Sequence, residues 1–290
     1  MSDDEEILNP DEQDLKGTSK DPELIFLPEK SREIYFRAYN NFNKWRVENG
    51  VNALSETVLL SYFMHLSHTK QPPTMWSIFS MLKATMNIKD DVHIENYSEL
   101  ITFLKGMQVG HNPKKSKMFT LSDIDKFIKE APDILYLGAK VILIIGINGG
   151  CRTNELMSLT VDGIEKHSDT LLLIKLPNSK TSTDRSFVVR STEYLQIVEH
   201  YQSLRPPNAK TDRFFVQYHK GKCSGQPMGR NKIGGIPRDI ATYLKLPNPQ
   251  DYTGHCFKRT SASLLADSGA DLSSLIRHDD IRPGTSRHKR

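Results

Sequence analysis

The sequence predicts a protein that is mainly α-helical with a small antiparallel β-sheet, divided into two domains. Apolar residues recur at helical spacing through most of the chain, and no strand-like alternation occurs before about residue 110. Two apolar runs, Thr170–Leu176 and Ser186–Val189, are the best strand candidates, and their connection suits an antiparallel hairpin. A chain of 290 residues can bury one large core or two modest ones, so two domains are the natural expectation.

The first third of the chain is predicted to hold a tail and a helical bundle. Residues 1–28 are polar, acidic and without apolar periodicity, which is typical of disorder. Residues 29–110 are expected to form a small helical bundle. Its first helix begins after Ser31 and ends at Gly50, and burial explains its aromatic stripe better than base stacking does: Tyr35, Tyr39, Phe42 and Trp45. Three more helices are expected over 55–66, 74–88 and 97–107.

A basic segment follows the bundle. Residues 111–118 read His-Asn-Pro-Lys-Lys-Ser-Lys-Met, contain a proline and have no apolar period, so we predict an interdomain linker. Two interpretations stay open. The segment is either a solvated hinge or a strap in which Lys114, Lys115 and Lys117 contact a phosphate backbone and release its counterions.

The second domain is predicted over residues 119–278. Thr120 starts a helix, and a long apolar helix then runs from Asp133 to the glycine pair Gly149-Gly150. After the predicted hairpin, helical spacing returns at 192–204. We expect residues 220–235 to form a Gly-rich basic loop, with helices over 238–244, 255–268 and 272–278. Residues 279–290 are a divergent basic tail that resembles no closing helix.

Composition excludes several classes of protein. The longest apolar run is interrupted by Lys140 and is too short to span a bilayer, and the acidic N-terminus does not suit a secretory signal. We therefore expect an intracellular protein with no membrane partner. Cys151, Cys223 and Cys256 have neither the count nor the spacing of a disulfide frame or a zinc site, so free thiols and no metal are expected.

The charge distribution points to nucleic acid. Residues 1–30 hold ten acids against three lysines, a balance of −7, and because the whole chain is +4, the remainder carries +11. A basic body with an acidic tail suits a protein that meets DNA, although many cytosolic proteins are equally basic.

Several cationic side chains lie at the ends and connections of predicted elements, where they can converge on one phosphate. Guanidinium, ammonium and imidazolium donors stabilise the negative charge of a phosphoryl transition state. No glycine-rich phosphate loop or metal-binding helix motif accompanies them. The set is Arg152, Lys180, His255, Lys258, Arg259 and His278.

Two stretches resemble the tyrosine recombinase (phage integrase) family. They are Gly149-Gly-Cys-Arg-Thr-Asn-Glu-Leu156 and the block from Gly254 to Ala266, which reads Gly-His-Cys-Phe-Lys-Arg-Thr-Ser-Ala-Ser-Leu-Leu-Ala. The wording of this block, with the basic segment before the second domain, is similar to Crypton-type recombinase-like proteins of animals. The resemblance covers residues 30–278. It implies a core-binding-type bundle followed by a catalytic-type domain, with DNA embraced between them.

The resemblance also implies roles for single residues. Arg152 matches the first active-site arginine, and Glu155 matches the acid that supports the site. Lys180 matches the hairpin lysine that protonates the leaving oxygen. His255 matches the histidine of the His-x-x-Arg box, and His278 matches the last His/Trp position. The same likeness favours DNA contacts by two further groups: the basic segment Lys114, Lys115 and Lys117, and the basic loop with Arg230 and Lys232.

Two departures from the family pattern affect the expected activity. The second arginine of the box is Lys258, with Arg259 one position out of register, so the bidentate guanidinium is lost there. The resemblance puts the nucleophilic tyrosine at Arg287, and no tyrosine follows Tyr252. Without the phenol no covalent phosphotyrosyl intermediate forms. We interpret the tail as the remnant of a truncated or respliced frame, with a nuclear-targeting patch or a phosphate contact as alternatives.

The sequence therefore predicts a nuclear, recombinase-derived protein that binds double-stranded DNA without cleaving it and needs no cofactor. A homo-oligomer on the DNA stays open, as does the choice between a mobile element and a domesticated host gene. Three alternatives remain. The chain is a truncated form of an active DNA-integrating recombinase, a nuclear protein-interaction module without DNA affinity, or a residual nuclease that uses His255 and Lys180 with water.

Overall fold

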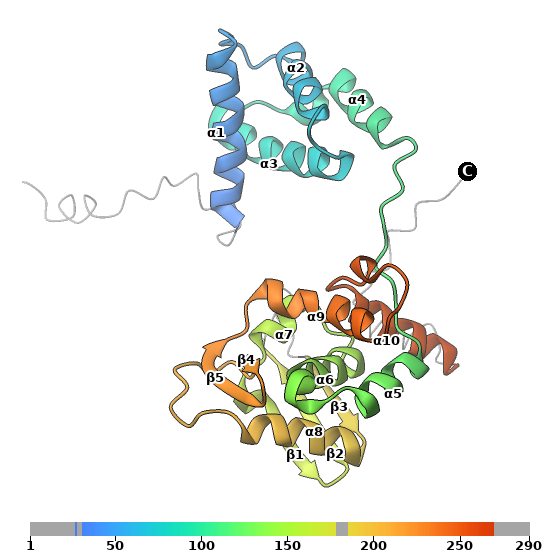
Figure 1. Ribbon diagram of the computed structural model, residues 1–290. Helices are drawn as coiled ribbons and strands as arrows, with labels where there is room; N and C mark the ends of the chain where they lie inside the picture. Colours follow the sequence, from blue (N-terminus) through green and yellow to red (C-terminus); the bar gives the residue numbers. More distant parts are fainter. Residues whose placement is uncertain (1–26, 28–30, 178–184, 270–290) are drawn as a thin grey trace, which may run out of the picture. The chain divides into compact units, whose positions relative to one another are not determined.

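The computed structural model describes residues 27, 31–177 and 185–269 and divides the chain into two compact units (Figure 1). Unit 1 covers residues 1–113 and unit 2 covers residues 114–290. The division falls inside the segment 111–118 that the sequence predicts as a linker. Lys180, His278, the expected helix over 272–278 and the tail 279–290 lie outside the described residues.

Unit 1 is a bundle of four α-helices: α1 (Arg32–Glu48), α2 (Glu56–Ser67), α3 (Pro72–Asp90) and α4 (Ser98–Gln108), with the short 3-10 helix η5 (Ile94–Asn96) before the last. Each helix turns an apolar face inward, as the spacing predicted. From the aromatic stripe of α1, Phe42 is fully buried, and the ring of Trp45 packs 5.2 Å from that of Tyr62. Phe42 therefore belongs to the core of unit 1, and Tyr39 and Trp45 of the same stripe pack against that core.

Unit 2 is built around α6 (Asp133–Asn148), which is buried on all sides from Leu137 to Ile147. A helix that is apolar all round must be enclosed, and α6 contacts α8 (Thr192–Ser203), α9 (Arg230–Tyr243) and α10 (Cys256–Asp267). Gly146 permits the close approach of α10, because a Cβ there would lie 2.9 Å from Cγ of Phe257. The remaining helices of this unit are α5 (Leu121–Glu130), α7 (Thr153–Ser158) and the 3-10 helices η6 (Val161–Gly163) and η7 (Pro249–Asp251).

A three-stranded antiparallel sheet packs against α6 and α8, in the order β1 (Ile164–Ser168), β2 (Leu171–Leu176), β3 (Arg185–Arg190). The predicted hairpin is confirmed as β2 and β3, with Ile174 opposite Phe187. Leu172, Ile174 and Leu176 are buried while the residues between them are more exposed, the alternation of a sheet with one face on the core. Strand β1 was missed, because its sequence Ile-Glu-Lys-His-Ser is too polar to indicate a strand.

The prediction of a loop over 220–235 was wrong. The range contains strand β5 (Lys222–Pro227), which pairs with β4 (Val216–His219), and the first residues of α9. Helix α9 begins at Arg230, eight residues before the predicted start. Gly234, Gly235 and Pro237 made this stretch unlike a helix in sequence. Burial of one face stabilises it nevertheless, through Ile233, Ile236 and Ile240.

The end of the predicted linker is bound to unit 2. The Lys117 backbone N–H donates to the Asp251 carbonyl at 2.9 Å, and the Thr253 N–H donates to the Ser116 hydroxyl at 3.0 Å. The Phe119 N–H donates to the fully buried Thr260 hydroxyl at 3.1 Å. These bonds tie the chain entering unit 2 to the segment that leads into α10 and to α10 itself.

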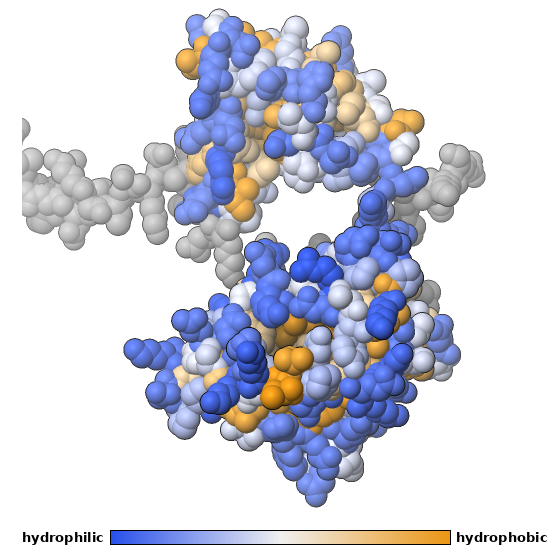
Figure 2. Space-filling model, in the orientation of Figure 1, coloured by the Kyte–Doolittle hydropathy of each residue, from blue (hydrophilic) through white to orange (hydrophobic). Residues whose placement is uncertain are grey.

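The surface seen in Figure 2 is mostly hydrophilic, with a hydrophobic patch on unit 2 around the start of α6. Ile134 and Leu135 are 59% and 57% exposed there. Within the described ranges, no helix is both long enough and apolar enough to cross a membrane.

Candidate functional site

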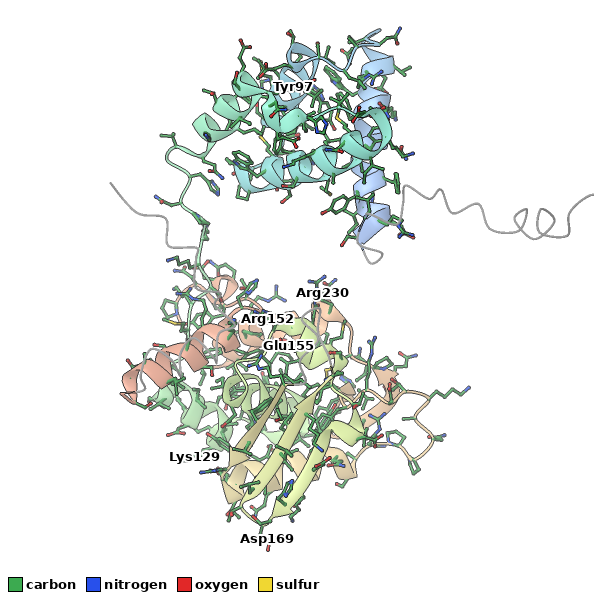
Figure 3. All side chains as sticks on the ribbon, turned by 180° about the vertical axis from the view of Figure 1, so that it is seen from behind. Tyr97, Lys129, Arg152, Glu155, Asp169 and Arg230 are labelled. Carbon is green, nitrogen blue, oxygen red and sulfur yellow. The ribbon has the colours of Figure 1, made fainter. Side chains whose placement is uncertain are left out.

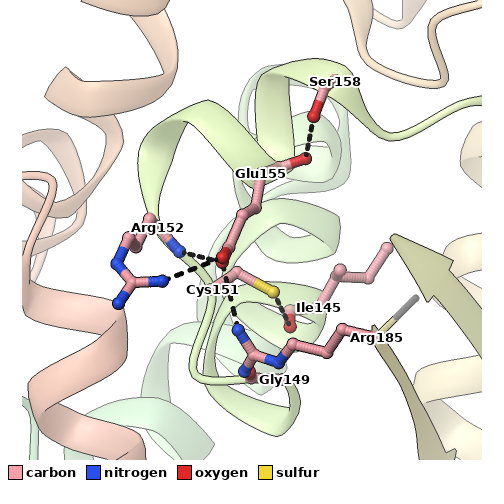
Figure 4. A network of polar contacts seen from close by, with 7 residues as sticks. All are labelled: Ile145, Gly149, Cys151, Arg152, Glu155, Ser158 and Arg185. Carbon is pink, nitrogen blue, oxygen red and sulfur yellow. Dashed lines mark hydrogen bonds and ion pairs between the residues drawn. The ribbon is translucent and has the colours of Figure 1, made fainter. Parts of the chain in front are cut away.

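Glu155 and two arginines form a polar network at the start of α7 (Figure 4). The Arg152 backbone N–H donates to Oε2 of Glu155 at 2.7 Å, and Arg152 Nη1 donates to Oε1 at 3.1 Å. From the other side, Arg185 Nη1 donates to Oε2 at 3.2 Å. The Glu155 side chain is only 8% exposed, so these donors stabilise a buried negative charge. Among the described residues, two guanidinium groups therefore share this one carboxylate.

The glycine pair before Arg152 brings strand β3 against this network. A Cβ on Gly149 would lie 2.4 Å from the Phe187 ring, and Gly150 has φ +54, a conformation that glycine adopts without strain. Arg185, the first residue of β3, also donates a hydrogen bond to the Gly149 carbonyl. The glycines therefore serve close packing, and the packing holds Arg185 beside Glu155.

A cavity of about 640 Å³ lies beside the network. It is formed where the start of α7, the first half of α9 and the segment before α10 meet. Arg152 and Arg230, which Figure 3 labels, lie near each other at one end of unit 2, while Asp169 lies at the opposite end. The described residues that line the cavity include three arginines and a histidine but no carboxylate: Arg152, Thr153, Asn154, Arg230, Asn231, Gly234, Gly235, Arg238, Gln250, Tyr252, Thr253, Gly254 and His255.

Two more glycines set the shape of this cavity. A Cβ on Gly254 would lie 2.2 Å from Oγ1 of Thr153 and 3.5 Å from Cα of Gly234. The Thr153 hydroxyl donates to the Gly254 carbonyl at 3.4 Å. Since no larger residue fits between them, α7, α9 and the segment before α10 meet at one point. That point brings Arg152 and His255, which are about a hundred residues apart in the sequence, to the same cavity.

Three donors in the cavity are available to a ligand. Arg230, Arg238 and His255 are exposed, and within the described part of unit 2 their side chains have no hydrogen-bond or ion-pair partner. Arg230 also begins α9, whose first N–H groups add partial positive charge at the same place. A positively charged cavity without acids suits an anion with several oxygens, such as a phosphodiester.

The structure does not bring every predicted residue to the cavity. Lys258 and Arg259, both half-buried, are not among the described residues that line it. The Arg259 guanidinium donates to the Ser116 carbonyl and thereby helps to anchor the chain entering unit 2. Lys232 is exposed on α9 and pairs with Asp239 at 3.4 Å. Lys180 and His278 lie outside the described residues.

The lysines of the basic segment differ in their contacts. Lys114 and Lys115 are exposed. Lys117 instead donates to the Pro247 carbonyl at 2.8 Å and lies 4.0 Å from an Asp251 carboxylate oxygen. These contacts hold Lys117 within unit 2.

Neither Tyr252 nor the two buried thiols are arranged as nucleophiles. The Tyr252 ring stacks on Phe119 with centroids 5.0 Å apart, and burial, followed by the negative charge of Asp123, raises the pKa of its phenol. Burial raises the pKa of Cys151 and of Cys256 to about 12. All three groups are therefore protonated at neutral pH and serve packing.

Sequence reasoning missed two arginines of the site, Arg185 and Arg238. Arg185 is the last residue of the connection predicted to carry Lys180, and a search for charged groups at strand ends would have found it. Arg238 was assigned to a helix but given no role, because nothing local shows that α9 faces Arg152. No group of three or more possible metal ligands occurs among the residues that the structure describes.

The sequence profile of the Phage integrase family matches residues 117–280, more than half of the chain. None of the curated proteins compared with the chain matches it. Several solved structures share the fold. One is the Tn1549 transposon integrase in complex with a circular intermediate DNA, with 16% identity, 88% of this chain and 87% of that chain covered, and a TM-score of 0.64.

Two further solved structures are similar. The XerH site-specific recombinase bound to palindromic difH substrate has 14% identity, coverage of 86% and 72%, and a TM-score of 0.65. A lambda integrase dimer bound to a COC' core site has 10% identity, coverage of 91% and 92%, and a TM-score of 0.59. At these identities the likeness shows the fold, while the profile match shows the family. The chain belongs to the phage integrase (tyrosine recombinase) family.

Proposed function

We propose that this chain binds double-stranded DNA through the cavity of unit 2, as a recombinase-derived protein of DNA recombination and integration. The observation that carries the proposal is the cavity itself, where Arg152, Arg230, Arg238 and His255 meet and none of the described lining residues is a carboxylate. Phosphate oxygens are the acceptors that such a donor set prefers. The three similar structures are described as bound to a circular intermediate DNA, to a palindromic difH substrate and to a COC' core site, which supports DNA as the partner of this chain.

We propose that unit 1 also binds the DNA. Its helix α1 carries the exposed Arg37 and Lys44, which suit contacts to the phosphate backbone rather than to base edges.

We further propose that a chain of these 290 residues binds DNA without cutting it. No tyrosine follows Tyr252 in the sequence, and the Tyr252 ring is buried against Phe119. The position of the second box arginine holds Lys258, which lacks a guanidinium fork. The alternative is that a longer form supplies a tyrosine and is an active integrating recombinase. A Crypton-type, transposon-derived origin and a nuclear location belong to the same proposal.

Binding is tested with the full chain and a fluorescent random-sequence duplex, by anisotropy at 50 to 200 mM salt. Neutralising two to four phosphates predicts a loss of affinity of about ten- to a hundredfold over this range. Arg230→Gln removes one donor and lowers the slope of log K against log salt by about one. Arg190→Gln is the matched control, because this exposed arginine lies at the far end of β3 from Arg185. An absence of binding at 50 mM salt refutes the proposal and favours a protein-interaction module.

Cleavage is tested separately with a nicked duplex substrate, from which a covalent recombinase adduct cannot religate. We expect no adduct that survives denaturing electrophoresis and no nicking. An adduct would refute the inactive assignment. Nicking that His255→Ala abolishes would instead establish a residual nuclease.

A further inference from the structure

We propose that Arg238 of α9 supplies the second phosphate-binding guanidinium in this chain, in place of the His-x-x-Arg box position that Lys258 occupies. The inference rests on the proposed DNA binding and deepens it. It assigns to one phosphodiester group three donors from three elements: Arg152 before α7, His255 before α10 and Arg238 within α9. All three line the cavity, and Lys258 is not among its described lining residues.

The position of the Arg238 guanidinium follows from contacts with α9 itself. Side chains on a helix lean toward its N-terminus, so Arg238 extends over the preceding turn. There, Nη2 of Arg238 lies 3.8 Å from the position that a Cβ on Gly235 would take. This is an ordinary van der Waals separation, so the guanidinium lies directly over Gly235.

The turn that Arg238 covers is the turn that meets the rest of the site. Gly234 lies beside Thr153, with 3.7 Å between its added Cβ and Cγ2 of Thr153, and its Cα is 3.5 Å from an added Cβ on Gly254. Thr153 follows Arg152 directly, and Gly254 precedes His255 directly. The Arg238 guanidinium therefore lies next to the point where the other two donors enter the cavity.

The Arg238 guanidinium is also available to bind a phosphate. Its side chain is exposed, and within the described residues it has neither a hydrogen bond nor an ion pair, although Asp239 and Lys232 on the same helix pair with each other. Arg259, the other arginine near the box, donates instead to the Ser116 carbonyl. A single ammonium at position 258 offers no planar fork, whereas Arg238 can contact two oxygens of one phosphate.

The proposal predicts coupling between Arg152 and Arg238. In the anisotropy assay, Arg238→Gln lowers affinity for the random duplex by about 10- to 100-fold, the range of a charge-assisted hydrogen bond, and Arg238→Lys recovers part of this loss. The double variant Arg152→Gln/Arg238→Gln loses less than the product of the two single losses, because both side chains bind one phosphate. Arg238→Gln paired with Arg190→Gln gives losses that multiply. Because the Arg238 side chain has no hydrogen-bond or ion-pair partner among the described residues, its replacement leaves the melting temperature unchanged, which separates binding from folding.

Three outcomes would overturn the proposal while wild-type DNA binding stands. The first is an Arg238→Gln affinity equal to that of Arg190→Gln. The second is multiplicative losses for Arg152 and Arg238, which would assign them to different phosphates. The third is restored affinity on adding Lys258→Arg to Arg238→Gln, which would return the role to the box position. If the wild-type chain does not bind the duplex at all, the proposed function itself fails.

Discussion

Glu155 holds two arginines in place, and its conversion to glutamine tests how the site is built. Glu155→Gln keeps the size of the side chain but removes its charge and replaces one acceptor oxygen by an amide that donates. The bonds from Arg152 Nη1 and Arg185 Nη1 go to different oxygens of Glu155, so one of them is lost in either amide orientation. The change removes the charged carboxylate that these two guanidinium groups share.

The expected loss in the free energy of unfolding follows from the burial of the Glu155 carboxylate. Removing one partner of a buried ion pair costs about 3 to 5 kcal/mol. Here the carboxylate is 8% exposed, but the Arg152 and Arg185 side chains are 42% and 25% exposed, so water offsets part of the loss. We expect the lower end, about 3 kcal/mol, which corresponds to a decrease of about 6 to 12 °C in the melting temperature of a domain of this size.

Calorimetry and circular dichroism of the full chain measure this decrease. Both tryptophans, Trp45 and Trp76, lie in unit 1, so their fluorescence reports unit 1 and controls for effects outside unit 2. Glu165→Gln is the matched control, because Glu165 is 41% exposed and pairs with Lys175 on the surface, where a pair contributes about 0 to 1 kcal/mol. A shift for Glu155→Gln no larger than that for Glu165→Gln would refute the reasoning.

Three further predictions concern packing, anchoring and pH. Gly254→Ala places a Cβ 2.2 Å from Oγ1 of Thr153, so we expect it to destabilise unit 2 by about 1 to 3 kcal/mol and to weaken DNA binding. The control is Gly106→Ala on α4, where the added Cβ meets no atom, and we expect it to stabilise unit 1 by about 0.5 to 1 kcal/mol. Equal melting temperatures for these two variants would contradict the packing argument. Thr260→Val leaves the buried Phe119 N–H without its acceptor and lowers the free energy of unfolding, measured with denaturant, by about 1 to 3 kcal/mol. The control Thr242→Val, at an exposed helical position, changes this free energy by less than about 0.5 kcal/mol. Burial raises the pKa of Cys151 and Cys256 to about 12, so their contribution to stability is complete below the unfolded value near 9 and is lost as pH rises from there toward 12. Cys151→Ala therefore reduces the loss of stability between pH 8 and pH 10 by about 1.4 kcal/mol, and an unchanged pH profile would show that the thiol ionises freely in the folded state.

Local sequence patterns predicted most of the fold. The helices of unit 1, the apolar helix α6 and the β2–β3 hairpin follow from apolar spacing and from glycine and proline positions, which act within a few residues. The two elements that the sequence did not predict depend on contacts outside these short stretches. Strand β1 is polar and depends on pairing with β2, and the first half of α9 contains two glycines and a proline and depends on burial against other elements.

The sequence by itself determined the identity of the local site residues. Arg152 and Glu155 are three residues apart, so a single helical turn brings their side chains together, and the glycine pair before them is readable as a turn. The resemblance of the two motifs also indicated that Arg152 and His255 share a site, and the structure brings both to one cavity.

Only the tertiary structure decided which other cations join them. Arg185 reaches Glu155 because Gly149 lets β3 pack closely, and Arg238 reaches the cavity because Gly234 and Gly254 let three elements meet. Arg259 turns instead to Ser116, on a segment more than a hundred residues earlier. The residue type gives the charge of a side chain. Its partner depends on which distant backbone segments come close, and packing throughout unit 2 determines this.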